Sequence, residues 1–183
     1  MVAGIGLLLA AAAVMALWQW GIGTSLKQNE QIVHTLRTLL PESQGAVLEP
    51  RSDNTMAVLS MGESDFVGIL EIPRFGSALP ICAQWGNLTQ YPCYFDGSIY
   101  DGSMQIGGTT QRGQYDFYRE ISVGDQVHFT DMEGNRFVYT VTNMHYTKHA
   151  DQAALQREDA ALTLFVKNVY AFEYLIISCN VLN

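Results

Sequence analysis

A series of short β-prone runs, separated by glycine and proline, sets the strongest limit on how this chain folds. From Phe66 onward, seven such runs follow one another at short intervals. Arg136–Tyr146 alternates apolar and polar residues, and Met-Glu-Gly-Asn joins it to Gln126–Asp131, which is typical of a β-hairpin. The other runs are Phe66–Pro73, Ala78–Ile81, Ser103–Gly108, Leu162–Val166 and Tyr174–Ser178.

Many short strands with few helices predict a mostly β domain over residues 66–183, a closed barrel of about eight strands. Only Asp116–Ile121 and Ala150–Gln156 have the composition of short helices. Because side chains alternate along a strand, one face of Arg136–Tyr146 is expected to carry Phe137, Tyr139, Val141 and Asn143.

The first residues predict a transmembrane helix over residues 1–21. Met1 to Trp20 contains Gln19 as its one clearly polar side chain, and a helix of about 20 apolar residues spans the hydrocarbon core. Trp18 and Trp20 stand at one end, where indole rings favour the headgroup region. The alternative is a cleaved signal peptide, which has a shorter apolar core and a basic start. The length of the apolar run and its bulky tryptophan end favour a membrane anchor over a cleaved signal peptide.

Residues 22–65 are expected to form a juxtamembrane helix and a linker. An apolar stripe at helical spacing predicts a helix over Thr24–Leu39, which Pro41 ends. The stripe could dock on the barrel or pair with another anchor helix, and docking is favoured. The composition of Glu42–Asp65 predicts a surface linker with a short apolar interruption at Met56–Leu59.

Charge and cysteine content exclude several functions. The net charge is −8 and only 10 Lys and Arg are spread along 183 residues, which argues against nucleic-acid binding. Cys82, Cys93 and Cys179 match no zinc-ligand spacing, so no metal or other cofactor is expected. These thiols are interpreted as small buried apolar groups, with a Cys82–Cys93 disulfide as the alternative in an oxidising compartment.

The order of the motifs along residues 66–181 resembles the sortase family, the membrane-anchored cysteine transpeptidases on the outer face of Gram-positive cells. Gly68–Pro73, read with Leu79–Ile81, is similar to the opening strands of that family. Met104–Gly108 resembles the strand before its catalytic histidine, and the segment from Tyr115 to Asp125 resembles the segment after that histidine. Leu162–Phe165 resembles the strand that ends in its catalytic cysteine.

The resemblance also shows where the chain departs from the family. The histidine position falls on Thr109, the cysteine position on Lys167, and the arginine position on Tyr174, or on Glu173 if the alignment slips by one. A threonine hydroxyl does not titrate near neutral pH, and a lysine acts as a nucleophile only when its pKa is far lower than usual. The resemblance therefore implies a sortase-like protein without an intact catalytic set.

Two other arrangements of an active site remain open at this level. A cysteine could have moved beside His145 or His149, or Lys167 could act as a nucleophile near Glu173 or Tyr174. Lys167 is also explained as a solvated lysine at a strand end or as an ionic partner of Glu173.

The family groove corresponds here to the segments Tyr146–Ala161 and Asn168–Glu173, and it gives the candidate ligand residues Val169, Tyr170, Phe172 and His149. The aromatic stretch Trp85–Tyr100 is a further candidate contact surface, although local packing is the more common explanation for both sets.

The resulting expectation is a single-pass membrane protein whose C-terminal domain lies outside the cell. It would bind a sorting-signal peptide, a surface or pilin protein, or a true sortase, and so assist surface-protein assembly. An active transpeptidase or hydrolase with a rearranged site, and a structural subunit of a membrane complex, are the alternatives.

Overall fold

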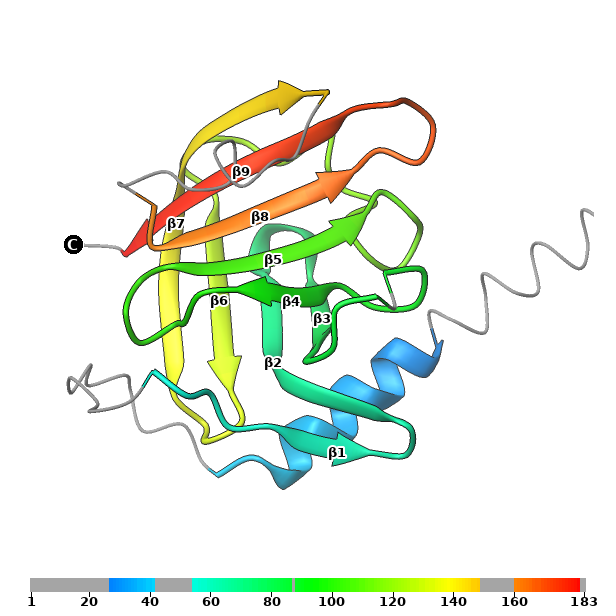
Figure 1. The fold of residues 1–183 in the computed structure, drawn as a ribbon, viewed down its shortest axis with the longest axis vertical. Coiled ribbons are helices and arrows are strands. Elements are labelled where there is room, and N and C mark those ends of the chain that lie inside the picture. The colour runs from blue at the N-terminus through cyan, green and yellow to red at the C-terminus, as the bar shows by residue number, and fades with distance from the viewer. Residues whose placement is uncertain (1–26, 42–53, 87, 149–159, 182–183) are drawn as a thin grey trace, which may run out of the picture.

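The computed structural model describes residues 27–41, 54–86, 88–148 and 160–181, and these form one β-sheet with one helix docked against it (Figure 1). The helix covers residues 27–39. The strands are β1 (Leu59–Met61), β2 (Ser64–Ile72), β3 (Ser77–Cys82), β4 (Cys93–Asp96), β5 (Met104–Thr109), β6 (Gln126–Asp131), β7 (Arg136–Thr147), β8 (Leu162–Lys167) and β9 (Tyr174–Val181).

The sheet closes into a barrel. Its strands run in the order β1-β2-β3-β4-β5-β8-β9-β7-β6, and β6 pairs back onto β2 between Gly68 and Glu71. Strands β2 to β9 therefore form an eight-stranded ring, and β1 extends from the edge of β2. This confirms the predicted closed barrel of about eight strands. Two pairings, β3–β4 and β5–β8, are parallel, and the others are antiparallel.

The barrel interior takes alternate residues of each strand. On β8, Leu162, Leu164 and Val166 belong to the main core, whereas Phe165 belongs to a separate cluster on the outer face. Because successive side chains of a strand point to opposite faces, the interior and exterior of the barrel carry different residues of the same strand.

The predicted alternation of β7 holds as far as Val141 and then fails. Phe137, Tyr139 and Val141 are buried, but Asn143 is exposed, contrary to the expectation that it shares their face. The pairing of β7 with β9 shifts register between Val141 and Asn143. Such a bulge adds one residue to one strand and so reverses the facing of all later residues in that strand.

The helix over residues 27–39 packs on the outer face of the barrel (Figure 1). Val33 and Leu36 are buried in a cluster with Phe66, Ile69 and Cys82, which confirms that the apolar stripe docks on the domain. Polar contacts and an ion pair fix its position: Asn29 Nδ2 donates to Gly113 O at 3.1 Å, Gln28 Nε2 to Tyr91 OH at 3.3 Å, and Arg37 lies 2.5 Å from Glu71.

Some expectations were wrong in detail. Asp116–Ile121 is a succession of turns, with Tyr118 N bonded to Tyr115 O and Glu120 N to Phe117 O, and not a helix. The large side chains Tyr115 and Phe117 are buried here, so tertiary packing overrides helix propensity. Strands β1 and β4 were missed because three or four residues give too little periodicity to recognise. The predicted helix Ala150–Gln156 lies outside the described residues.

Within the described ranges, no helix is both long enough and apolar enough to cross a membrane. The expected anchor, residues 1–21, lies outside these ranges.

Candidate functional site

Three residues that the motif resemblance assigns to the family's catalytic positions lie side by side in the sheet. Thr109, the last residue of β5, is the Cα partner of Lys167, the last residue of β8. Lys167 is in turn the Cα partner of Tyr174, the first residue of β9. We call Thr109, Lys167 and Tyr174 the outer row. Residues far apart in the sequence are thus brought into one line at one end of the barrel.

The outer row faces away from the barrel core. Along β8, interior positions alternate with outward ones, and Lys167 follows the interior residue Val166. Directly paired residues of neighbouring strands share a face, so Thr109 and Tyr174 also point outward. The next outward residues along β8 and β9, Phe165 and Ile176, are buried in a small cluster against which Tyr174 packs. The outer row therefore stands at the edge of an apolar surface.

The side chain of Thr109 is already held in the local structure. Its Oγ1 accepts a hydrogen bond from Gln111 N at 3.4 Å, and its backbone N donates to Gln114 Oε1 at 3.0 Å. Gln114 is buried and its Nε2 also donates to Leu88 O at 2.8 Å. These contacts order the chain after β5. A hydroxyl at this position accepts and donates hydrogen bonds but does not ionise near neutral pH.

The loop between β8 and β9 is held by a compact set of hydrogen bonds. Asn168 is buried, its backbone N donates to Glu173 O at 3.0 Å, and its Nδ2 donates to Glu173 Oε1 at 3.2 Å. Tyr170 N donates to Asn168 Oδ1 at 3.0 Å, and Val169 N donates to Thr110 Oγ1 at 3.1 Å. The motif analysis did not single out Asn168 or Thr110, because their role depends on partners brought together by the fold.

A cluster of three aromatic rings lies on the outer face beside the row. Trp85 and Phe95 are 45% and 37% exposed, and both lie against the buried Phe165, with ring centroids 5.6 and 5.3 Å away. A Cβ on Gly107 would lie 2.6 Å from the rings of both Trp85 and Phe165. The absence of a side chain at Gly107 therefore lets this aromatic cluster settle directly on β5.

The rest of the stretch Trp85–Tyr100 does not join this surface. Tyr91 is buried under the docked helix and contacts Phe66. Tyr100 packs against Phe137 and donates its hydroxyl to Asp131 Oδ2 at 2.7 Å. Only part of the predicted contact surface, Trp85 and Phe95, is thus exposed on the outer face beside β5.

All three cysteines are buried as free thiols. Cys82 and Cys93 are Cα partners in the β3–β4 pairing and lie in the cluster beneath the helix, but no disulfide joins them. Cys179 faces the barrel interior, and burial raises the pKa of its thiol to about 12. The interpretation of these residues as small buried apolar groups is confirmed.

The structure does not place Cys179 beside His145. Cys179 is the Cα partner of the core residue Val141, whereas His145 is the Cα partner of Ile176 on the outer face. The second histidine considered for such a site, His149, lies outside the described residues. Among the described residues, no group of three or more His, Cys, Asp or Glu comes together to hold a metal ion.

The candidate groove residues of the β8–β9 loop are exposed. Val169 is 40% exposed, Tyr170 74%, and Phe172 is fully exposed at 101%. Glu173, at the end of this loop, is held by its bond to Asn168.

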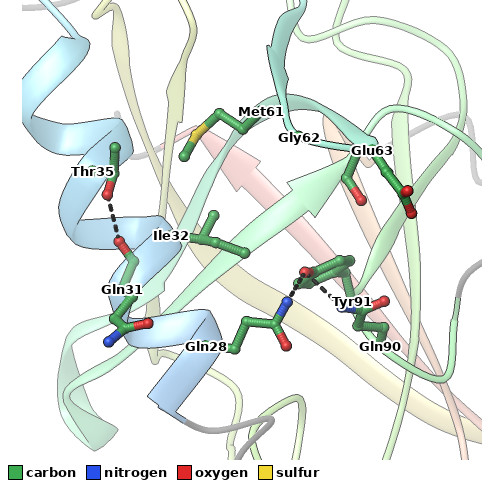
Figure 2. A pocket seen from close by; sticks show the side chains of 10 residues that line it. Gln28, Gln31, Ile32, Thr35, Met61, Gly62, Glu63, Gln90 and Tyr91 are labelled. Atoms are coloured by element: carbon green, nitrogen blue, oxygen red, sulfur yellow. Dashed lines mark hydrogen bonds between the residues drawn. The ribbon is translucent and has the colours of Figure 1, made fainter.

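Two clefts flank the docked helix. The larger, of about 540 Å³, lies between the helix and the β1–β2 hairpin (Figure 2). Its wall carries mostly uncharged polar side chains, and two of them, Gln28 and Gln90, donate to the hydroxyl of Tyr91. The smaller, of about 410 Å³, lies on the side of Gly113. Neither is lined by the outer row.

No protein-family model matches the sequence, and neither does any curated protein. Solved structures do match. Sortase A from Corynebacterium diphtheriae has a TM-score of 0.54 and 15% identity over 88% of this chain and 84% of that one. Sortase C1 from Streptococcus suis has a TM-score of 0.55 and 15% identity, over 64% of this chain and 73% of that one. A sortase D5 transpeptidase from Clostridium perfringens has a TM-score of 0.53 and 18% identity, over 64% of this chain and 79% of that one. The chain that carries the outer row has the sortase fold.

Proposed function

We propose that this chain is a sortase-family protein that binds without cysteine transpeptidation. It is anchored in the cell membrane by residues 1–21, and its barrel lies outside the cell. The barrel binds a sorting-signal peptide, a surface or pilin protein, or a true sortase, and so assists surface-protein assembly. The observation that carries the proposal is the outer row, where a hydroxyl, an amine and a phenol stand in register. The motif resemblance assigns these three positions to the family's histidine, cysteine and arginine.

The chemistry of the outer row supports a loss of the parent reaction. Transpeptidation through a thioester needs a thiolate as nucleophile and an imidazole to move protons. Thr109, Lys167 and Tyr174 supply neither group. The high pKa that burial imposes on Cys179 keeps that thiol protonated at neutral pH, and thiols in this state are inert.

The surface beside the row supports binding. Trp85 and Phe95 expose large apolar area on a fixed base formed by Phe165, so little side-chain entropy is lost when a ligand packs on them. Half-exposed aromatic side chains of this kind are enriched among the residues that dominate protein and peptide binding. A peptide that packs on Trp85 and Phe95 would contact this aromatic cluster beside the outer row.

The docked helix argues against a purely structural role for the apolar stripe. Val33 and Leu36 are covered by the barrel, so these positions are not free to pair with another anchor helix. Assembly of a membrane complex through this stripe would require the helix to leave the barrel.

Peptide binding and turnover on the full chain in nanodiscs test the proposal. We expect a fluorescent sorting-signal peptide to bind, and Trp85→Ala to weaken binding about tenfold, as expected for one aromatic anchor. Val123→Ala, at an exposed apolar residue between β5 and β6, is the matched control and should leave affinity unchanged. Cleavage or transfer of the peptide that a thiol-blocking reagent abolishes would show the chain to be an active enzyme with a rearranged site.

A further inference from the structure

The tip of the β8–β9 loop carries an unusual exposure of apolar side chains. Val169, Tyr170 and Phe172 are 40%, 74% and 101% exposed, and we call these three residues the apolar tip. Most apolar side chains of this size elsewhere in the described chain are buried in the core clusters. A concentrated exposure on one loop indicates a surface that another phase or molecule covers.

The loop is built to keep these side chains outward. The backbone N of Val169 is bonded to Thr110 Oγ1, and that of Tyr170 to Asn168 Oδ1. Asn168 in turn bridges to Glu173 through both its backbone and its side chain. These bonds fix the base of the loop to β5 and β9, so the apolar tip is presented by a defined structure and does not fold back on the barrel.

The residues around the tip give it the pattern of a membrane-surface contact. Lys167 stands at the end of β8, and Lys148 follows Thr147, the β7 partner of Tyr174; both lysines are exposed. Tyr146, on the same end of β7, is 55% exposed. Tyrosine and lysine favour the headgroup region, and an apolar tip beyond them can enter the boundary of the acyl chains.

The position of the apolar tip in the fold also supports a contact with the membrane. The loop that joins β8 to β9 and the first turn of the helix over residues 27–39 both lie on the right-hand side of Figure 1, the loop in its upper half and the turn in its lower half. Residues 22–26 separate that turn from the proposed anchor, and they reach at most about 18 Å when fully extended. A bilayer that holds residues 1–21 can therefore lie along this side of the molecule.

We infer that the apolar tip docks on the surface of the bilayer in which the chain is anchored, with Lys148 and Lys167 facing anionic headgroups. The inference rests on the proposed membrane anchor. It adds a second attachment, which fixes the tilt of the barrel and holds the outer row close to the membrane surface. Peptide ligands would then meet the outer row at the headgroup level.

Site-directed spin labelling of the full chain in nanodiscs with anionic lipid tests this inference. A nitroxide is attached at Phe172→Cys and, as the matched control, at Val181→Cys, an exposed apolar position at the other end of β9. The three native cysteines are buried, and the labelled wild-type chain gives the background. We expect collisions with a water-soluble nickel chelate to be several times fewer at residue 172 than at residue 181, with oxygen collisions increased. Lys148→Gln should reduce this protection.

A third label, at Ala10→Cys, separates this inference from the proposed anchor. If residue 10 is buried in lipid and residue 172 is as accessible to the chelate as residue 181, the docking of the tip is overturned while the anchor stands. If residue 10 is also accessible, both fail. Protection of residue 172 that appears only when a protein partner is added would likewise overturn a lipid contact.

Discussion

The two faces of β8 contrast sharply. Its inward residues Leu162, Leu164 and Val166 are fully buried in one continuous core, as expected of a sortase-fold barrel. Its outward residues end in Lys167, where the family resemblance requires a cysteine. The inward face of β8 thus has the apolar residues expected of the fold, whereas its outward face ends in a lysine where the resemblance places the family's cysteine. Because side chains of a strand alternate, the residues that set the fold and those that set the chemistry change independently.

Substitution on the two faces should have very different effects on stability. Leu164→Ala removes a fully buried side chain and is expected to lower the free energy of unfolding by about 2–5 kcal/mol. Lys167→Ala, three residues along the same strand but exposed, should change it by less than about 0.5 kcal/mol. Denaturant unfolding measures both, and equal losses would show that Lys167 has a structural role that its exposure does not reveal.

Replacing the outer row with the family's catalytic residues should introduce thiol-dependent activity without changing the barrel. In the triple variant Thr109→His, Lys167→Cys and Tyr174→Arg, three directly paired positions receive the residues of the family. We expect thiol-dependent cleavage of a sorting-signal peptide about 100-fold above the wild-type background, the low end of what general acid–base catalysis contributes. The matched control carries Lys167→Ser with the same two partners and should stay at background. Equal turnover by the two variants would argue against the assigned positions.

A smaller effect is expected from a charged network elsewhere on the barrel exterior. Arg136 donates to His128 Nδ1 at 2.6 Å and lies 3.4 Å from Glu71. Partial burial, and then the charge of Arg136, lowers the pKa of His128 below its ordinary value of 6.5.

The neutral form of His128 is therefore favoured in the folded state, and the unfolded chain binds more protons below about pH 6.5. Stability should fall slightly as pH drops through this value and continue to fall toward the lower folded pKa. Denaturation midpoints at pH 7.5 and pH 5 should differ less in His128→Gln than in the wild type. If His128→Gln has the same pH dependence as the wild type, the loss of stability at low pH comes from other titratable groups.

The sequence predicted most of the strands because their hydrophobic periodicity is local. The hairpin of β6 and β7 was recognised from its turn, and β6 was predicted with its observed bounds, Gln126–Asp131. The prediction failed for Asn143 because a bulge is a property of the pairing with β9 and leaves no trace in local alternation. It also failed for Asp116–Ile121, where burial of Tyr115 and Phe117 outweighs local preference.

The motif resemblance assigned Thr109, Lys167 and Tyr174 to one site, but only strand register could place them side by side. The same holds for the aromatic cluster, since Phe165 and Trp85 meet over Gly107 through contacts between distant segments.

By itself, the sequence determined the class of fold and the docked helix stripe, and it named the residues that the resemblance assigns to the three family positions. These three features follow from the composition, the hydrophobic periodicity and the order of the motifs along the chain. Tertiary structure alone decided that Cys179 faces the core while His145 faces outward, and that the apolar tip is held away from the barrel. The physical reason is that facing and exposure depend on pairing register and long-range hydrogen bonds, which join residues with no periodic relation along the chain.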